Sequence, residues 1–238
     1  MGKNVLIIGA SGDIGQAIVK RLSKEGYQII LHYNNNSKAI SDLRNEISDK
    51  GILSVLQADL SKDTELDDFI KQFVFQVDGI IFAGGKAQFG LFQETSSLVM
   101  DQMLHLHVKA PWKITKHVLP GMIQQQYGKI IFVTSIWGEV GASYEVVYSS
   151  VKGAQNSFVK ALAKEVAPSG ISVNAVSPGF IDTKMNKHLS MEEKESLFSE
   201  IPMNRAGSPE EVAHTVSFLM DKRSNYIQGE IINLTGGW

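Results

Sequence analysis

The chain of 238 residues has no cysteine, which excludes disulfide bonds and thiolate metal sites. It has no excess of one charge either, because 23 Lys and Arg residues stand against 25 Asp and Glu residues, a net charge of −2. No basic field for nucleic acid or an anionic membrane is therefore expected. No apolar run approaches the roughly 20 residues of a membrane helix, and no signal peptide precedes the first strand. We expect a cytoplasmic protein without nucleic-acid or membrane partners.

Short apolar runs and longer helical stretches alternate along the whole chain. The apolar runs are nearly continuous, which is typical of strands covered on both faces. The order predicts an α/β protein: a single Rossmann domain over residues 1–238, with a doubly wound, seven-stranded parallel sheet and helices on both faces. The expected strands are 5–8, 28–31, 53–58, 79–82, 129–133, 172–176 and 230–234, and the clearest helices are 14–25, 37–50, 104–126 and 148–167.

One long segment carries no strand pattern. Its polar, irregular part, around residues 184–206, fits a lid over a substrate site and a pair of surface helices equally well. The periodicity does not separate these two interpretations.

The stretch GASGDIG follows the first strand and opens the first helix. Its glycines, Gly9, Gly12 and Gly15, do not match the G-x-G-x-x-G spacing. The position nevertheless favours a phosphate cradle, because the amides and dipole of a helix N-terminus attract anions. Asp13 lies in this turn, and we interpret it as the N-cap of the helix, turned away from a ligand.

The end of the second strand bears on the choice of dinucleotide. An acidic residue there would bind the adenosine ribose and select NAD, whereas its absence leaves room for the 2′-phosphate of NADP. The chain reads LHYNNNSK, with Tyr33 at that place followed by Asn34 and Asn35, and with Ser37 and Lys38 nearby. NADP(H) is favoured over NAD(H).

Tyr148 and Lys152 are one helical turn apart and share a face. This pair alone would also fit an ordinary amphipathic helix, and Ser135, after the fifth strand, makes the pattern specific. A ketone reductase must deliver a proton to the carbonyl oxygen. A lysine ammonium is expected to lower the pKa of a neighbouring phenol, and a serine hydroxyl can orient the same oxygen.

These motifs, with ADLS at 58–61, VNAVSPGFIDT at 173–183 and the closing YIQGEIINLTGG, give the chain a full-length resemblance to the short-chain dehydrogenase/reductase family. The resemblance implies that Ser135 binds the substrate oxygen, Tyr148 is the acid/base and Lys152 contacts Tyr148 and the cofactor ribose. It implies a homotetramer or homodimer built partly on two long central helices, and no metal. The cofactor residues that it implies are Gly9, Ser11, Gly12, Asp13, Ile14, Gly15, Tyr33, Asn34, Asn35, Asp59, Leu60, Ala83, Gly84, Tyr148, Lys152, Pro178, Gly179, Ile181 and Thr183.

Three positions leave alternatives open. Asp59 fits an adenine contact and a helix cap equally well. The chain has FAGG at 82–85 where the family usually has Asn-Asn-Ala-Gly. His107 replaces the family's relay asparagine, so it is a candidate for proton relay, although a packed helix histidine is as good an interpretation. His105 and His107 diverge on a helix and do not predict a metal site.

Two substrates carried on proteins come from resemblances within the family. The chain resembles reductases of 3-oxoacyl groups on acyl carrier protein, but Gln126 and Ser169 stand where those enzymes present basic residues to the carrier. The region around Trp137, Glu139 and Tyr144 resembles a reductase of the 5-aminopentanone group on translation elongation factor P, and we favour that substrate. A non-catalytic NADP-sensing protein is the alternative from another class, since a fold does not fix a function.

Overall fold

The computed structural model of the protein describes residues 3–47, 51–186 and 190–238. It confirms all seven predicted strands, with ends that move by one or two residues. The strands are β1 (Asn4–Ile8), β2 (Gln28–Tyr33), β3 (Ile52–Gln57), β4 (Gly79–Phe82), β5 (Gly128–Val133), β6 (Ile171–Pro178) and β7 (Ile231–Leu234).

The strands form one parallel sheet in the order β3-β2-β1-β4-β5-β6-β7. The chain winds outward in one direction from β1 to β3 and in the other from β4 to β7. Strand order therefore reverses between β1 and β4, and the crevice at the carboxyl ends beside such a switch point is where α/β proteins bind dinucleotides. The predicted doubly wound, single-domain fold is confirmed.

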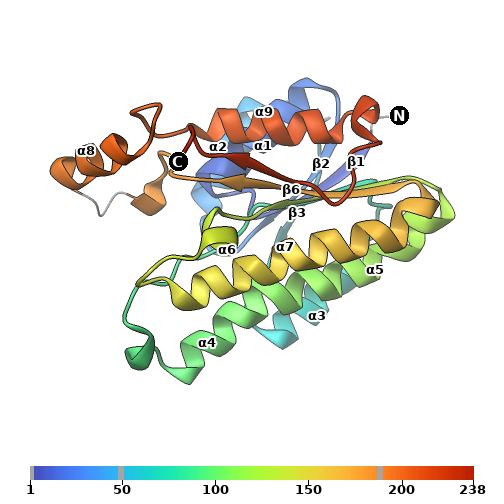
Figure 1. The fold of residues 1–238 in the computed structure, drawn as a ribbon. Coiled ribbons are helices and arrows are strands. Elements are labelled where there is room, and N and C mark those ends of the chain that lie inside the picture. Colours follow the sequence, from blue (N-terminus) through green and yellow to red (C-terminus); the bar gives the residue numbers. More distant parts are fainter. Residues whose placement is uncertain (1–2, 48–50, 187–189) are drawn as a thin grey trace.

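Helices cover both faces of the sheet (Figure 1). One face is covered by α1, α2 and α9, and the other by α3, α5 and α7. The helices are α1 (Asp13–Lys24), α2 (Ser37–Glu46), α3 (Asp63–Lys71), α4 (Ser97–Leu104), α5 (Ala110–Gln124), α6 (Trp137–Val140), α7 (Val146–Val166), α8 (Met191–Glu200) and α9 (Pro209–Met220).

Successive strand residues enter two separate cores. Leu6 and Ile8 of β1 pack with Phe69 of α3 on one face, whereas Val5 and Ile7 pack with α1 and α9 on the other. This alternation explains the nearly continuous apolar runs in the sequence, because both faces of each central strand are buried.

The predicted helix over 104–126 is wrong in one respect. Residues His105–Lys109 form a π-helical turn that joins α4 to α5. A π-turn widens the helix locally and is frequent at functional sites. The predicted helix over 37–50 ends at Glu46, and residues 48–50 lie outside the described residues.

The segment predicted as a lid contains a short 3-10 turn (Lys184–Asn186) and α8; residues 187–189 lie outside the described residues. A capping box of Ser190 and Glu193 begins α8, and none of the helix's residues is buried. Figure 1 shows α8 projecting from the side where the strands end. That it closes over a substrate stays a prediction. Among the described residues, no helix has the length and apolar character needed to cross a membrane.

Candidate active site

The structure brings the three predicted catalytic side chains together at the carboxyl end of β5. Ser135 follows β5, while Tyr148 and Lys152 share one face of α7. The Ser135 side chain lies close enough to the Tyr148 hydroxyl to oppose the rise of its pKa. The Lys152 Nζ donates to the Val133 carbonyl at 2.9 Å and lies 5.6 Å from the centroid of the Tyr148 ring. The two hydroxyls and the amine therefore belong to one site.

The predicted lowering of the Tyr148 pKa is wrong. Burial, with a further contribution from the Glu145 carboxylate, raises the pKa of Tyr148 to about 12, against the opposing hydrogen bond from Ser135. Burial also lowers the pKa of Lys152 to about 7. The sequence showed the spacing of the pair but not its burial, and burial disfavours both charged forms. The phenol is consequently a fully protonated acid at neutral pH.

The π-turn places the His107 side chain beside the catalytic phenol. The two rings meet edge to face at 5.9 Å between centroids, and His107 is 1% exposed. Its Nε2 lies 3.0 Å from the Lys86 carbonyl oxygen, while its Nδ1 is buried without a hydrogen-bond partner. Burial and the nearby Lys152 lower the His107 pKa to about 3. His107 is therefore neutral, and any part in proton relay is as a neutral imidazole.

The glycines in the turn after β1 are needed for two different reasons. A Cβ at Gly15 would lie 2.1 Å from the Gly9 carbonyl oxygen, and one at Gly9 would lie 2.3 Å from the Gly84 Cα. Both positions are required by the packing of the fold. A Cβ at Gly12 would meet nothing closer than 3.5 Å, and the Gly12 backbone is extended (φ −75°, ψ 161°). The fold does not require glycine there, whereas close approach of a pyrophosphate to the backbone does.

The predicted capping role of Asp13 is wrong. Gly12 is the N-cap of α1, without a side-chain hydrogen bond, and Asp13 is the first helical residue. The Asp13 carboxylate instead accepts a hydrogen bond of 2.6 Å from the Lys184 main-chain N–H and lies 3.6 Å from the Lys184 Nζ. It turns away from the start of its own helix because a stronger partner lies across the crevice. It thereby joins the cradle to the segment after β6.

Sequence analysis missed His32, whose side chain holds the main chain of the cradle at Gly9 by a hydrogen bond. His32 is 5% exposed; its Nδ1 accepts the Gly9 N–H at 3.2 Å, and its Nε2 donates to the Ala58 carbonyl at 3.1 Å. Burial lowers its pKa to about 4, so the ring stays neutral and keeps these two roles. The only signal in the sequence is a histidine within the buried strand pattern of LHY.

The residues predicted to meet the adenosine end lie along one rim of the crevice. The exposed Asn34 and Asn35 follow β2, and the Tyr33 Oη donates to the Gln57 Oε1 at 3.3 Å. Asn36 caps α2 and also lies 3.4 Å from the Ser11 carbonyl oxygen, a link that sequence analysis missed. No carboxylate lies among residues 33–38.

The residues that follow β3 and β4 form the next part of the crevice rim. Asp59 accepts hydrogen bonds from both the Ser61 N–H and the Ser61 hydroxyl, at 3.0 and 2.7 Å, so its side chain holds the turn before α3. This contact agrees with the capping interpretation of Asp59 only in part, because Lys62, and not Asp59, is the N-cap of the helix. The Leu60 side chain is buried in the core. Ala83 and Gly84 continue β4, with the Ala83 N–H bonded to the Ile8 carbonyl at 3.0 Å.

The segment after β6 forms the opposite rim. Pro178 ends the strand, and the Gly179 N–H donates to the Leu234 carbonyl at 3.0 Å. Ile181 is buried and forms an isolated bridge with Gly207, while Thr183 is half-buried. These contacts hold the backbone of 178–183 at the carboxyl ends of the strands.

This crevice fits a dinucleotide. It offers the amides and positive dipole of the α1 N-terminus, the open position at Gly12, and a polar rim at 33–38 without a carboxylate. The buried, unpartnered His107 Nδ1 and the catalytic phenol lie at the other end.

A small cavity of about 230 Å³ is lined by residues that directly follow Ser135 and by the C-terminal segment. The Trp137 N–H donates to the Ser135 Oγ at 3.2 Å, and Trp137 and Trp238 meet edge to face at 5.1 Å between centroids. The exposed Glu139 lines the same cavity and accepts from the Asn233 Nδ2 at 3.3 Å. A carboxylate beside two indoles is a suitable environment for an ammonium group.

Comparisons with known proteins agree with this geometry. The family profile described as Enoyl-(Acyl carrier protein) reductase matches residues 9–238. The chain is 45% identical over 240 residues to a Bacillus subtilis (strain 168) protein named uncharacterized oxidoreductase YmfI, covering 100% of this chain and 99% of that one. It is 33% identical over 241 residues to the 3-oxoacyl-[acyl-carrier-protein] reductase FabG of Staphylococcus epidermidis (strain ATCC 35984), covering 100% and 99%.

A solved structure shares the fold. It is that of a 3-oxoacyl (acyl-carrier-protein) reductase from Agrobacterium tumefaciens C58 with NADP bound, at a TM-score of 0.91 and 24% identity, covering 100% of this chain and 94% of that one.

Proposed function

The chain belongs to the short-chain dehydrogenase/reductase family, and on that basis we propose that this oxidoreductase reduces a ketone to a secondary alcohol with NADPH. The observation that carries the proposal is the single site formed by Ser135, Tyr148 and Lys152 at the carboxyl end of β5. A reduced nicotinamide, when bound, supplies the hydride.

Side chains of the protein supply the proton that the carbonyl oxygen takes up. The Ser135 and Tyr148 hydroxyls belong to the same site, and each can donate a hydrogen bond to a carbonyl oxygen bound there. As the oxygen becomes an alkoxide, it takes the Tyr148 proton, because an alkoxide is a stronger base than a phenolate even when the pKa of the phenol is about 12. The resulting phenolate is stabilised by Lys152 in its ammonium form.

We assign His107 to the return of that proton. Its unpartnered Nδ1 and its edge-to-face contact with Tyr148 support a relay by a neutral imidazole. Gln155, buried and donating at 2.8 Å to the His107 carbonyl, holds the π-turn. A His107→Phe variant that keeps its full kcat for ketone reduction would contradict this assignment.

The preference for NADPH rests on the rim after β2. The missing carboxylate at Tyr33, with the exposed Asn34, Asn35 and Lys38 close by, leaves room and donors for a 2′-phosphate. The reductase of known structure with NADP bound has the same fold.

For the substrate, we propose the 5-aminopentanone group on translation elongation factor P. This ketone carries a primary amine, and the cavity of Trp137, Glu139 and Trp238 offers a carboxylate and two indoles for an ammonium group. The alternative is a 3-oxoacyl group on acyl carrier protein, the substrate named for the Staphylococcus epidermidis relative. Gln126 and Ser169 offer no positive charge to the acidic carrier protein, and the nearby Lys129 is only 1% exposed.

Parallel assays of NADPH consumption decide between these functions. We expect kcat/KM to be at least about tenfold higher with aminopentanone-modified elongation factor P than with an acetoacetyl thioester. Glu139→Gln should lower kcat/KM for the amine-bearing ketone about tenfold and leave reduction of a neutral diketone unchanged. Preference for the thioester would favour the carrier-protein substrate, and no turnover of any ketone would favour an NADP-sensing protein.

A further inference from the structure

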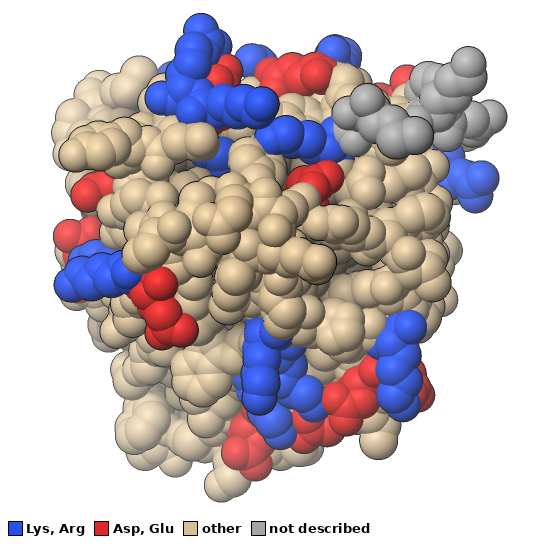
Figure 2. Space-filling view, turned by 90° about the vertical axis from the view of Figure 1, so that its right-hand side faces the viewer, with Lys and Arg blue, Asp and Glu red and all other residues tan. Residues whose placement is uncertain are grey.

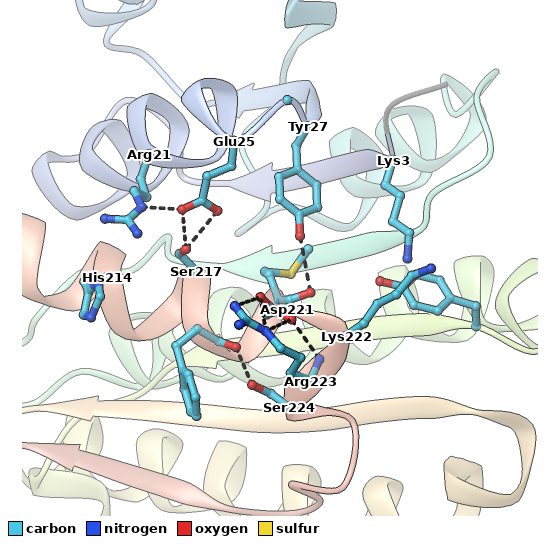
Figure 3. A pocket seen from close by; sticks show the side chains of 14 residues that line it. Lys3, Arg21, Glu25, Tyr27, His214, Ser217, Asp221, Lys222, Arg223 and Ser224 are labelled. Carbon is cyan, nitrogen blue, oxygen red and sulfur yellow. Dashed lines mark hydrogen bonds and ion pairs between the residues drawn. The ribbon is translucent and has the colours of Figure 1, made fainter.

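A second cavity, of about 990 Å³, opens at the side of the molecule where the strands begin, opposite the catalytic residues (Figure 3). Its walls come from the segment before β1, the turn between α1 and β2, Tyr127 before β5, and the end of α9 with the 3-10 turn that follows. Its size lies within the range of small-molecule sites. The reaction proposed above uses none of these residues.

Some of the charges in this cavity are already paired. Arg21 and Glu25 form an ion pair of 2.5 Å, and Arg223 and Asp221 form one of 2.7 Å (Figure 3). Glu25 also accepts from the Ser217 hydroxyl at 2.7 Å. Both carboxylates that line the cavity, Glu25 and Asp221, are therefore already paired with neighbouring side chains.

Two lysines line the cavity, Lys3 and Lys222, and Lys129 lies behind its wall. None of the three has a carboxylate within ion-pair distance among the described residues, although Asp78 attracts Lys3 and Asp221 attracts Lys129 from farther away. The Lys3 Nζ lies 3.0 Å from the centroid of the Tyr127 ring. The Lys129 side chain is 1% exposed, and its Nζ donates to the carbonyl of Asp221, behind the cavity wall, at 3.2 Å. We call this cavity, with the three lysines, the lysine cavity.

The ammonium groups repel one another. Burial, and then repulsion by Lys222, lowers the pKa of Lys3 to about 8, while burial and repulsion by Lys3 lower the pKa of Lys129 to about 8. The buried Tyr127 Oη has no hydrogen-bond partner. A bound anion would relieve this repulsion, since opposite charge favours the ammonium forms.

The shape of the basic surface points to a compact ligand. Figure 2 shows the side where the strands begin: Lys and Arg side chains lie in its upper part near a few acidic ones, and a broad uncharged area separates them from mixed basic and acidic side chains along the lower edge. A nucleic acid would require a longer basic track. The aromatic side chains of Tyr27, Tyr127 and Phe218 add apolar surface to the lysine cavity.

We propose that the lysine cavity binds a small phosphorylated molecule, whose phosphate lies between the ammonium groups of Lys3 and Lys222 and whose remaining part packs against Tyr27 and Phe218. Lys129 adds positive charge from behind the wall. Lysine is a common phosphate ligand in proteins, and the terminal ammonium offers three donors.

The test is a titration with inorganic pyrophosphate at constant ionic strength, followed by ¹H–¹⁵N correlation spectra of the whole protein. We expect saturable shifts of the Gly26, Ser217 and Ser224 amides at the lysine cavity. Shifts at Gly12 and Gly15 report the cofactor cradle separately, so this result does not depend on the proposed enzymatic function. Lys222→Ala and Lys3→Ala should each weaken binding at the lysine cavity about tenfold or more. Lys164→Ala, which changes an exposed lysine near the end of α7, should not.

The proposal is overturned if pyrophosphate moves only the amides of the cradle. It is equally overturned if the Lys222→Ala and Lys164→Ala proteins bind alike, or if succinate at the same ionic strength binds as tightly as pyrophosphate. Thermal melting of each variant confirms that the compared proteins are folded.

Discussion

Tyr148 and Lys152 show how burial prepares a proton donor. Lys152 is buried and Tyr148 is half-buried, and both charged forms are disfavoured, with pKa values of about 12 for the phenol and about 7 for the amine. At neutral pH the phenol holds its proton until a stronger base, the developing alkoxide, forms beside it. In this form the site is suited to reduction, because the acid is loaded before the hydride arrives.

Gly12 gives the sharpest residue-level test of the cradle. Gly12→Ala should change the free energy of unfolding by less than about 0.5 kcal/mol, because its Cβ meets nothing within 3.4 Å and its backbone is extended. It should raise the Kd for NADPH about tenfold or more. Gly15→Ala is the matched control, and it should destabilise the fold by about 1–3 kcal/mol through its clash with Gly9. Unchanged NADPH affinity in Gly12→Ala would place the pyrophosphate elsewhere.

His32 makes stability depend on pH. Its pKa falls from the ordinary 6.5 to about 4 on folding, so between these values the unfolded chain binds more protons than the folded protein. The free energy of unfolding should therefore decrease as the pH is lowered from about 6.5 toward 4. His107 acts in the same direction. In urea titrations, His32→Gln should reduce this slope by up to about 1.4 kcal/mol per pH unit. The exposed His214, changed to Gln, is the control, and equal slopes in the two variants would count against His32.

At the scale of elements, the strands were readily predicted and the local details of the site were not. Runs such as VLII and IIFV are apolar at every position, so β1 and β5 stand out. The three catalytic residues followed from spacing and resemblance. The π-turn at 105–109, by contrast, has no signal in a helical pattern, since its effect is one extra residue per turn.

The error at Asp13 has a similar cause. A sequence shows which residues can cap a helix, but the partner that Asp13 takes, the Lys184 N–H, is 171 positions away. His32 was missed for the same reason, because its partners, Gly9 and Ala58, directly follow two other strands, β1 and β3. Contacts between distant elements decide both roles.

The contact between α1 and the segment after β6 can be tested directly. Asp13→Ala removes the acceptor of the Lys184 N–H, so the KM for the ketone or the Kd for NADPH should rise about threefold to tenfold. The melting temperature should move by less than about 2 °C, since no cap is lost. Lys184→Ala keeps the main-chain donor and should have a much smaller effect. A clear drop in melting temperature without a change in KM or Kd would restore the capping role.

At the scale of the whole molecule, the two cores lie between the sheet and the helices on its opposite faces, so the helices form much of the outer surface. Leu104, Trp112 and Ile123 are 51%, 48% and 40% exposed along α4 and α5. Exposed apolar side chains of this size are frequent on surfaces for protein association. The homotetramer or homodimer built partly on the long central helices stays a prediction.

Sedimentation velocity tests this assembly. The protein should sediment as a dimer or tetramer, and Trp112→Glu should shift it toward smaller species, because a charge would be buried without a partner. Phe75→Glu, at a similarly exposed phenylalanine after α3, should leave the assembly unchanged. A monomeric protein, or an unaltered Trp112→Glu assembly, would show that this surface has another use.

The central claim is that the Tyr148 hydroxyl delivers the proton during ketone reduction. The most direct measurement compares NADPH oxidation by the protein and by Tyr148→Phe with the same diketone, alongside the Kd of each for NADPH. We predict that kcat falls about 10²- to 10⁴-fold while the Kd changes by less than about twofold. Retention of most of the activity in Tyr148→Phe would contradict the account, because phenylalanine has no proton to deliver.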